Sequence, residues 1–389
     1  MESDQKSYDI AVIGGGVFGA WSAYQLRLRG HSVLLIDAFG SGNNRSSSGG
    51  ESRATRCGYG DREIYTKMAW QSLASWKRLF ASAAAGRTLF YKIGMLWLGS
   101  PGHPHLEGSR TAMRNLGIPF EEVDFVELKH RYPQISIAAD TVGIFEPEAG
   151  ALMARQAVAT VAAEFRRIGG RIVIDKVLPP SGTGTLQQID TVQGHHFTAS
   201  KFIFACGPWL PKVLPSIMGN RISPSRQEVI FWGTTPGTDD FEPQKMPVWI
   251  DYSDDRGFYG FPNLEARGFK VAFDNHGPSF DPDSDDRIVP SERIAAARAY
   301  VAERFPALAG APVAETRVCQ YENSSDNHFV IDRHPEIENV WVVGGGSGHG
   351  FKHGPAVGEY VADLITGQRE PEYAFLLRAD RDIRQHAAV

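Results

Sequence analysis

The sequence predicts a protein of two parts, an α/β part built on a parallel sheet and a part with a mainly antiparallel sheet. Three observations predict this fold. A β-α-β pattern opens the chain, apolar runs typical of parallel strands recur in its middle and near its end, and runs rich in aromatic and β-branched residues lie between them. The length of 389 residues suffices for two or three domains.

Composition and charge narrow the class of protein. The chain is 42% hydrophobic and 22% charged, as in folded globular proteins, and its 40 Lys+Arg and 45 Asp+Glu are interspersed. Without a basic stripe we expect no nucleic-acid partner. The start of the chain is not net positive and no apolar run spans a bilayer, so we expect no export and no membrane segment. The three cysteines are too scattered for a disulfide framework or a metal site, which favours the cytoplasm: Cys57, Cys206 and Cys319.

A β-α-β unit occupies the first forty residues. Residues 8–13 form a short apolar run without proline, and residues 32–36 form a second one. Gly30 precedes the second run as a helix stop. The stretch between the runs has apolar residues at helical spacing, namely Trp21, Tyr24 and Leu28.

A glycine motif GxGxxG joins the first strand to the helix. Gly14 permits the tight turn, Gly16 lets the backbone approach a pyrophosphate, and Gly19 lets the helix pack close to the strand. Asp37, 23 positions after Gly14, ends the second strand, where it can accept hydrogen bonds from ribose hydroxyls. The helix N-terminus offers N–H donors to phosphates. The alternative is a glycine-rich turn without a ligand, but the context predicts a Rossmann-like dinucleotide site.

The motif alone does not separate NAD from FAD. Residues 201–205 and 340–343 form two further apolar strands, and the second strand runs into the glycine-rich segment 344–350. A helix is expected over residues 355–365, because Pro355 suits a first turn. A cofactor domain assembled from the start, middle and end of the chain favours FAD.

The intervening stretches predict the second sheet. Five runs look like strands of a mostly antiparallel sheet: 92–99, 228–233, 247–252, 257–261 and 269–273. Residues 294–304 look helical. We expect the substrate pocket where the two domains meet. The predicted boundaries assign residues 1–90, 150–222 and 318–389 to the FAD-binding domain, and residues 91–149 and 223–317 to a substrate domain.

Several segments together carry a family resemblance. They read DIAVIGGGVFGAWSAYQL, GGESRATRCGYG, GIFEPEAGAL, GFYGFPN with FKVAF, RVCQYENSSDNHFVIDRHP and GGGSGHGFKHGPAVGE. In this order they resemble the flavin-dependent secondary amine oxidases typified by monomeric sarcosine oxidase, in the D-amino acid oxidase-like superfamily. Relatives in that family include N-methyltryptophan oxidase, pipecolate oxidase and the fructosyl amino acid oxidases.

The resemblance implies that Cys319 carries the FAD covalently. It matches the cysteine that forms a thioether with the 8α-methyl of the isoalloxazine. Only a thiolate within reach of the ring could add to that methyl. The alternative is that Cys319 is a small buried hydrophobe.

The resemblance also implies a site for the substrate carboxylate. Lys352 matches the lysine that contacts this carboxylate and the cofactor, and Arg56 matches its arginine partner. A paired arginine and lysine bind a carboxylate by charge-assisted hydrogen bonds. For Arg56 and for Arg53, which we assign to the cofactor, the alternatives are a surface ion pair or a contact with the FAD phosphates.

Five more residues receive roles from the resemblance. Lys270 matches a lysine over the flavin that promotes reaction with O2, although many strand lysines are solvated edge residues. Tyr259 and Tyr321 match aromatic residues of the substrate pocket, or belong to the core. Ser347 and Gly348, in the C-terminal glycine-rich segment, are assigned to the cofactor.

Two positions depart from the sarcosine-specific relatives. These relatives carry histidine four positions before the residue matching Arg53 and four positions after the one matching Lys270, where this chain has Gly49 and Asp274. A carboxylate near the pocket favours a cationic or polyhydroxylated substrate.

The resemblance implies an FAD-dependent oxidase of secondary amino acids such as N-methyl amino acids. It would oxidise the C–N bond to an imine and reduce O2 to H2O2, as a cytoplasmic monomer. The alternatives are a fructosyl amino acid or pipecolate-type oxidase, a flavin dehydrogenase with another electron acceptor, and a dinucleotide-binding protein without catalytic activity.

Overall fold

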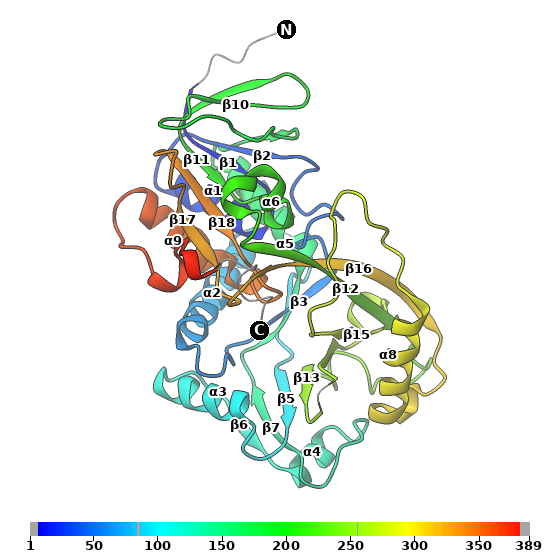
Figure 1. Ribbon diagram of the computed structural model, residues 1–389. Coiled ribbons are helices and arrows are strands. Elements are labelled where there is room, and N and C mark those ends of the chain that lie inside the picture. Colours follow the sequence, from blue (N-terminus) through cyan, green and yellow to red (C-terminus); the bar gives the residue numbers. More distant parts are fainter. Residues whose placement is uncertain (1–6, 84–85, 255, 382–389) are drawn as a thin grey trace.

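The protein is described by a computed structural model that covers residues 7–83, 86–254 and 256–381. Two large sheets and one small sheet organise the chain (Figure 1). A seven-stranded sheet lies in the upper half of the view and an eight-stranded sheet in the lower half. The long strands β12 (Ile222–Trp232) and β16 (Val313–Ser324) cross the middle of the molecule.

The seven-stranded sheet has a parallel core. In the order β18, β11, β1, β2, β9 every neighbouring pair is parallel, whereas β17 and β10 join antiparallel. The start, the middle and the end of the chain therefore meet in one sheet, which confirms the prediction. Its strands are β1 (Tyr8–Ile13), β2 (Val33–Asp37), β9 (Arg171–Ile174), β10 (Gln188–Asp190), β11 (His196–Phe204), β17 (Val330–Arg333) and β18 (Val340–Gly344).

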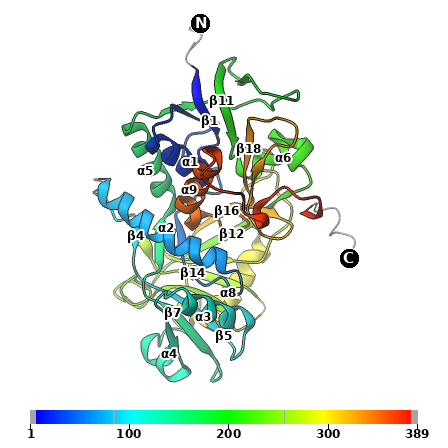
Figure 2. The same ribbon diagram turned by 90° about the vertical axis from the view of Figure 1, so that its left-hand side faces the viewer.

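Three helices cover one face of this sheet (Figure 2). Helices α1 (Val17–Leu28) and α9 (Gly354–Ile365) pack closely together, and α5 (Ala154–Arg167) packs beside α1. Alternate residues of β1 point to these helices and to the opposite face, and all of them except Asp9 are buried. A parallel sheet covered on both faces needs such a continuous apolar run. The short helices α6 (Leu210–Val213) and α7 (Pro215–Met218) contribute to the opposite face.

The eight-stranded sheet is mainly antiparallel, as predicted. Its order is β16, β12, β15, β14, β13, β5, β7, β6, and only the pair β13 and β5 is parallel. Besides β12 and β16, its strands are β5 (Met95–Gly99), β6 (Glu121–Val123), β7 (Val142–Glu146), β13 (Val248–Tyr252), β14 (Phe258–Phe261) and β15 (Phe269–Phe273).

One face of the eight-stranded sheet forms an aromatic core with helix α8 (Ser291–Arg304). Tyr300 of this helix stacks on Phe258 at 4.0 Å between ring centroids, and its hydroxyl donates to Asp251. Phe269 and Trp249 complete the buried cluster. Because strand residues alternate, filling this face with apolar side chains leaves the other face free for polar ones.

The remaining elements of the described residues are a small third sheet, three helices and six short turns. A three-stranded sheet has the order β3, β8, β4, and α2 packs against α9. These elements are β3 (Ser52–Thr55), β4 (Phe90–Tyr91), β8 (Gly150–Met153), α2 (Glu63–Ser82), α3 (Pro104–Asn115), α4 (Phe125–Arg131) and the 3-10 turns η1 (Gly207–Trp209), η2 (Leu264–Ala266), η3 (Pro306–Leu308), η4 (Phe351–His353), η5 (Tyr373–Phe375) and η6 (Ala379–Arg381).

Several predicted elements differ from the observed ones in length. The run 92–99 forms a strand only from Met95, whereas β12 begins six residues before the predicted run. The sequence did not predict α2 or β16 as elements. The predicted boundary at residue 318 falls within β16, which pairs with β12 along its length. The domain boundaries themselves stay a prediction.

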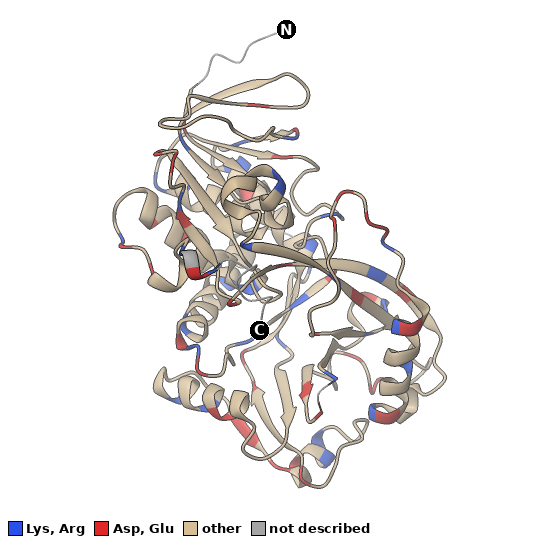
Figure 3. Cartoon of the chain, viewed as in Figure 1, with Lys and Arg blue, Asp and Glu red and all other residues tan. Residues whose placement is uncertain are grey.

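Charged residues of both signs are scattered along both halves of the structure (Figure 3). Across the part of the chain that the structure describes, no helix combines the length and the apolar character needed to cross a membrane. Residues 1–6 lie outside the described residues. They contain part of the acidic N-terminal segment on which the expectation of no signal peptide rests.

The contact between α1 and α9 depends on Gly358, and it yields a first prediction. A Cβ at Gly358 would lie 2.6 Å from the carbonyl carbon of Trp21, so the helices would have to separate. We expect Gly358→Ala to lower the free energy of unfolding by about 1–3 kcal/mol, the usual range for overpacking. Denaturant unfolding of wild type and Gly358→Ala measures this difference. The exposed neighbour Glu359→Ala is the control, expected within about 0.5 kcal/mol of wild type; equal effects of the two variants would contradict the argument.

Candidate functional site

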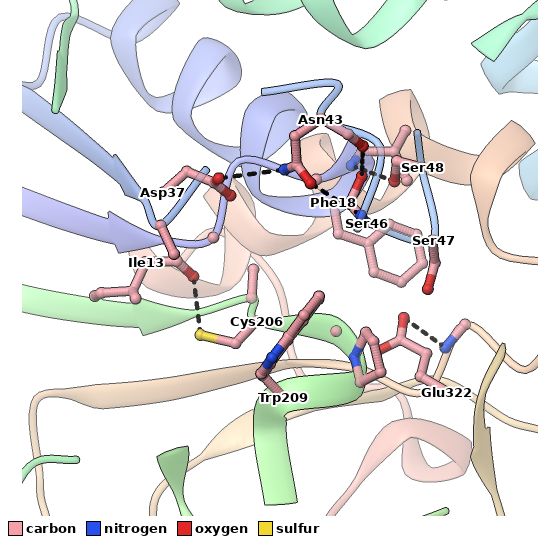
Figure 4. A pocket seen from close by; sticks show the side chains of 18 of the residues that line it. Ile13, Phe18, Asp37, Asn43, Ser46, Ser47, Ser48, Cys206, Trp209 and Glu322 are labelled. Atoms are coloured by element: carbon pink, nitrogen blue, oxygen red, sulfur yellow. Dashed lines mark hydrogen bonds between the residues drawn. The ribbon is translucent and has the colours of Figure 1, made fainter. Parts of the chain in front are cut away.

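A large cavity opens at the carboxyl ends of β1, β2, β11 and β18 (Figure 4). This edge is where ligands bind in parallel α/β sheets. The cavity encloses about 1200 Å³ of empty space. Its lining is mostly apolar, and it includes six residues that the sequence predicted for the site: Gly14, Gly16, Asp37, Arg53, Tyr321 and Gly348.

The glycine motif forms one wall of the cavity by close backbone packing. Gly14 has φ +105°, and a Cβ there would lie 2.3 Å from the carbonyl oxygen of Ala205. A Cβ at Gly19 would lie 1.8 Å from the carbonyl oxygen of Gly14. Gly19 therefore packs the helix onto the turn, as predicted, and does not line the cavity.

Asp37 holds the glycine turn from the end of β2. Its Oδ2 accepts a hydrogen bond from the N–H of Gly15 at 2.6 Å, and its Oδ1 accepts one from Phe39 at 2.9 Å. Asn43 also approaches Oδ1 (Figure 4). The helix α1, which starts at this turn, has no acidic residue in its first turn. Its positive end is therefore available to phosphate groups.

Two buried oxygens in the cavity wall favour a polar ligand. Ser47 Oγ and Glu322 Oε2 are buried without a hydrogen-bond partner among the described residues. Such orphaned groups are rare because each costs desolvation free energy. A long apolar cavity with a phosphate-binding turn at one end and these polar atoms in its wall fits a flavin dinucleotide.

Strand register gathers four predicted residues on one face of the eight-stranded sheet. Cys319 and Tyr321 alternate along β16, and Cys319 lies opposite Gln227 of β12. Tyr259 of β14 lies opposite Ala272 of β15, and Lys270 is two positions before Ala272. Lys270 and Tyr259 therefore belong to the same face. This is the face that α8 leaves uncovered. It turns toward β3, which carries Arg53.

Arg53 connects this face to the cavity. Its side chain lines the cavity, and its Nη2 lies 3.2 Å from Cys319 Sγ. The same guanidinium donates hydrogen bonds to the carbonyl oxygens of Ser52 and Ser47. Cys319 is buried and does not itself line the cavity. A neighbouring guanidinium stabilises negative charge on sulfur, the form in which cysteine reacts.

Lys270 is buried against β3, the strand that also carries Arg53. Its Nζ donates to the carbonyl oxygen of Ser52 at 3.1 Å and lies 4.3 Å from the centre of the Phe261 ring. Burial, followed by the positive charge of Arg53, lowers the pKa of Lys270 to about 7. The amine can therefore hold or release its proton near neutral pH. Its predicted alternative, a solvated edge lysine, is wrong, because only 2% of the residue is exposed.

A second cationic group lies behind the cavity. Tyr59 contacts both Arg56, whose guanidinium lies 4.4 Å from the ring centre, and Lys352, whose Nζ donates to the Tyr59 hydroxyl at 2.8 Å. Burial, followed by the charge of Arg56, lowers the pKa of Lys352 well below its usual range. The structure thus brings Arg56 and Lys352 together, in what we call the Arg56–Lys352 pair. Neither side chain lines the large cavity.

Several residues of this group were missed by sequence reasoning. Glu146, from β7, accepts hydrogen bonds from the N–H groups of Cys57 and Gly58 and from Trp97 Nε1, and so holds the loop that follows Arg56. The Trp97 ring lies 5.0 Å from the Arg56 guanidinium. A lone glutamate at the end of an apolar run gives no signal of this contact, which joins residues 89 positions apart.

The remaining predicted residues are placed as follows. Ser347 Oγ donates to the Gly345 carbonyl and accepts from the Ser324 N–H, and it does not line the cavity; its cofactor role stays a prediction. A Cβ at Gly49 would lie 1.8 Å from the Asn43 carbonyl oxygen, so this loop excludes a histidine there. In the described part of the chain, no three His, Cys, Asp or Glu side chains cluster so as to hold a metal ion.

Residues 9–364 match the family of proteins described as FAD dependent oxidoreductases. The chain belongs to this family. The oxidoreductase is 32% identical over 370 residues to monomeric sarcosine oxidase of Streptomyces avermitilis, covering 93% of this chain and 94% of the relative. It is 28% identical over 372 residues to N-methyl-L-tryptophan oxidase of Yersinia pestis, covering 94% and 96%. These matches confirm the predicted family and the FAD cofactor.

Solved structures confirm the fold of the oxidoreductase. L-proline dehydrogenase from P. horikoshii superposes with a TM-score of 0.81 at 21% identity, covering 95% of this chain and 96% of that one. Fructosamine oxidase (Amadoriase II) from Aspergillus fumigatus superposes with a TM-score of 0.80 at 20% identity, covering 97% and 92%. At these identities the likeness concerns the fold alone.

The lowered pKa of Lys270 predicts a pH-dependent stability. The unfolded chain keeps the ordinary lysine pKa of about 10.4, so between pH 7 and that value the folded state binds fewer protons and gains stability as pH rises. In Lys270→Met this contribution is absent. We expect the variant to be more stable than wild type at pH 7, by a margin that narrows as pH rises. Denaturant unfolding of both proteins checks this; a margin independent of pH would contradict the lowered pKa.

Proposed function

We propose that the protein is an FAD-dependent oxidase of secondary amino acids, of which N-methyl amino acids are the simplest. The observation that supports this most is the Arg56–Lys352 pair. Lys352 is buried and Arg56 is half-buried, and neither forms an ion pair with any residue that the structure describes. They contact carbonyl and phenol oxygens instead. Buried charges are normally paired, so a carboxylate from outside the chain is the expected partner.

The chain's own residues would bind and orient such a substrate. The Arg56–Lys352 pair would hold the carboxylate, and Tyr259 and Tyr321 would pack on the amine from the eight-stranded sheet. Bound FAD would supply the redox chemistry, taking a hydride equivalent from the carbon next to nitrogen and passing two electrons to O2 to give an imine and H2O2. No strong base is required if the amine binds neutral. The protein contributes position and charge.

The relatives support the substrate class. Two of them are named for oxidases of sarcosine and of N-methyl-L-tryptophan, both secondary amino acids with a carboxylate. The site also favours a second candidate. Asp274, at the end of β15, adds negative charge that acts on Arg56, Lys352 and Tyr321. This carboxylate favours substrates that also carry a cationic or polyhydroxylated group, such as fructosyl amino acids, over sarcosine itself.

The proposal includes a covalent flavin at Cys319, a lysine that assists O2, a cytoplasmic location and a monomeric state. The contact of Cys319 with Arg53 supports the first, because the guanidinium stabilises the attacking thiolate. The position of Lys270 beside Arg53 and Cys319 supports the second. Gel filtration tests the monomeric state.

The substrate class predicts the effect of Arg56→Met. Losing a charged hydrogen-bonding partner of the carboxylate costs about 2–3 kcal/mol, which lowers kcat/KM by roughly 30- to 150-fold, mainly through KM. Anaerobic bleaching of the flavin by a panel of N-methyl, cyclic and fructosyl amino acids, with decarboxylated analogues, measures it. The exposed Arg78→Met is the control.

Two outcomes of that panel contradict the proposal. If no amine bleaches the flavin, the proposed reaction is wrong. If decarboxylated analogues react as fast as the amino acids in wild type, the role of the Arg56–Lys352 pair is wrong. Fast reduction with slow reoxidation by O2 would indicate a dehydrogenase.

The covalent link predicts different behaviour of two cysteine variants. Wild-type protein precipitated with acid should give a yellow pellet, heavier by one FAD on the peptide that contains Cys319, and Cys319→Ser should release its flavin to the supernatant. Cys206→Ser is the matched control, because Cys206 lines the cavity yet its thiol contacts the Ile13 carbonyl and not a cation. A Cys319→Ser protein with inseparable flavin would refute the assignment.

The oxygen role predicts a selective defect in Lys270→Met. A positive charge beside the ring stabilises the charge that develops on O2. We expect reoxidation by O2 to slow by roughly 100-fold or more, with a much smaller change in anaerobic reduction by substrate. Stopped-flow measurement of the two half-reactions separates them, and equal losses in both would count against the role.

A further inference from the structure

The Glu322 side chain is a half-buried acid in the wall of the cofactor cavity to which no role is assigned above. It extends from β16, directly after Tyr321, and lines the cavity (Figure 4). Its Oε1 accepts a hydrogen bond from the Gly346 N–H at 3.2 Å. Its Oε2 is buried and has no hydrogen-bond partner in the described ranges of the chain.

Glycines at two strand ends make room for this carboxyl group. A Cβ at Gly346 would lie 2.8 Å from Glu322 Oε1, and a Cβ at Gly344 would lie 3.4 Å from Oε2. Gly207, after β11, faces Oε2 at a similar distance. The backbone at the carboxyl ends of β18 and β11 therefore forms a niche that the carboxyl group fills, and a side chain at Gly346 would press on this group.

The niche offers the carboxyl group no cation. No Lys, Arg or His is within ion-pair distance of Glu322 in the part of the chain described, and the titratable side chain that faces it is the Cys206 thiol. Burial, opposed only by N–H groups of the glycine-rich segment, raises the pKa of Glu322 to about 7. An isolated buried carboxylate is costly, so the group needs either a proton or a hydrogen-bond donor from a ligand.

The FAD that this family binds carries suitable groups. Its ribityl hydroxyls and the N–H of its ring donate hydrogen bonds, whereas its pyrophosphate is anionic and would repel a carboxylate. Tyr321 packs against Gly348, and Arg53 lines the same cavity while contacting Cys319. The Gly346 N–H that donates to Glu322 belongs to the same glycine-rich segment as Gly348, so the Glu322 carboxyl group lies near the segment on which Tyr321 packs, although Tyr321 and Glu322 extend from opposite faces of β16.

We propose that the Glu322 carboxyl group is a direct hydrogen-bonding contact of the flavin half of the bound cofactor, and that it takes up a proton when the flavin is reduced. Reduction adds two electrons and one proton to the ring and leaves one negative charge there. The proton on Glu322 comes from solvent and balances that charge. Glu322 is a positioning and charge-compensating residue. The inference rests on FAD binding, and not on the identity of the amine substrate.

The test is the midpoint potential of the flavin as a function of pH, in wild type and in Glu322→Gln. The potential is measured by dye-coupled reduction without any amine, from about pH 6 to about pH 9. Glutamine keeps the shape and hydrogen-bonding capacity but cannot titrate. The two curves should coincide at low pH, where Glu322 is neutral, and diverge above pH 7, with the wild-type potential falling more steeply. The exposed Glu336→Gln should follow wild type at every pH.

Parallel or coincident curves across the whole range would overturn the proposal. A second measurement guards against a variant that does not fold: the visible spectrum of oxidised flavin in Lys270→Met, which lacks the other group with a pKa of about 7, should change with a single ionisation near pH 7. If Glu322→Gln does not fold, a Lys270→Met spectrum without that change overturns the proposal, and a spectrum that has it supports the contact. Since no amine is used, a failure of the proposed oxidase activity leaves both readouts intact.

Discussion

Four cations, of which Lys270 and Lys352 are buried and Arg53 and Arg56 half-buried, set the main constraint on this structure. Arg53, Arg56, Lys270 and Lys352 are gathered where the two large sheets meet, and each donates to a backbone carbonyl oxygen in place of a carboxylate. Burying a cation without a counter-ion costs several kcal/mol. A fold that carries four of them must be stable enough to tolerate the cost, and it gains a site that attracts anions and developing negative charge.

The rest of the fold holds these cations in place. The aromatic core under α8 fills one face of the eight-stranded sheet, which leaves the opposite face to Lys270, Tyr259, Cys319 and Tyr321. The parallel sheet supplies the glycine turn and the cavity. The two halves are joined at Ser52, whose carbonyl oxygen accepts hydrogen bonds from both Lys270 and Arg53. A cofactor in the cavity would thus have cations on one side and a phosphate-binding turn at the other end.

Helix α2 supports the turn that carries Lys352. Trp76 Nε1 donates to the carbonyl oxygen of Lys352 at 3.0 Å, and the Ser72 hydroxyl accepts from the Ala356 N–H. These contacts fix the turn η4 and the start of α9, on which Lys352 is carried. His353, at the same turn, lies 2.6 Å from the Tyr59 hydroxyl. These contacts hold the Lys352 side chain in a fixed position, as expected where a charged group must meet a small substrate.

The sequence by itself determined the β-α-β unit, with Gly14 at its tight turn, Gly19 at the close contact of helix and turn, and Asp37 at the end of its second strand, because a tight turn and its neighbouring strand are local structures. It also determined the parallel and antiparallel runs, since their hydrophobic patterns are local. Resemblance to a family pointed to Arg56, Lys352, Lys270 and Cys319. Only the tertiary structure decided that Tyr59 contacts both Arg56 and Lys352, and that Glu146 and Glu322 reach the site, because register and packing join residues far apart in sequence. A single acidic residue in a strand looks the same whether it meets solvent or a buried niche.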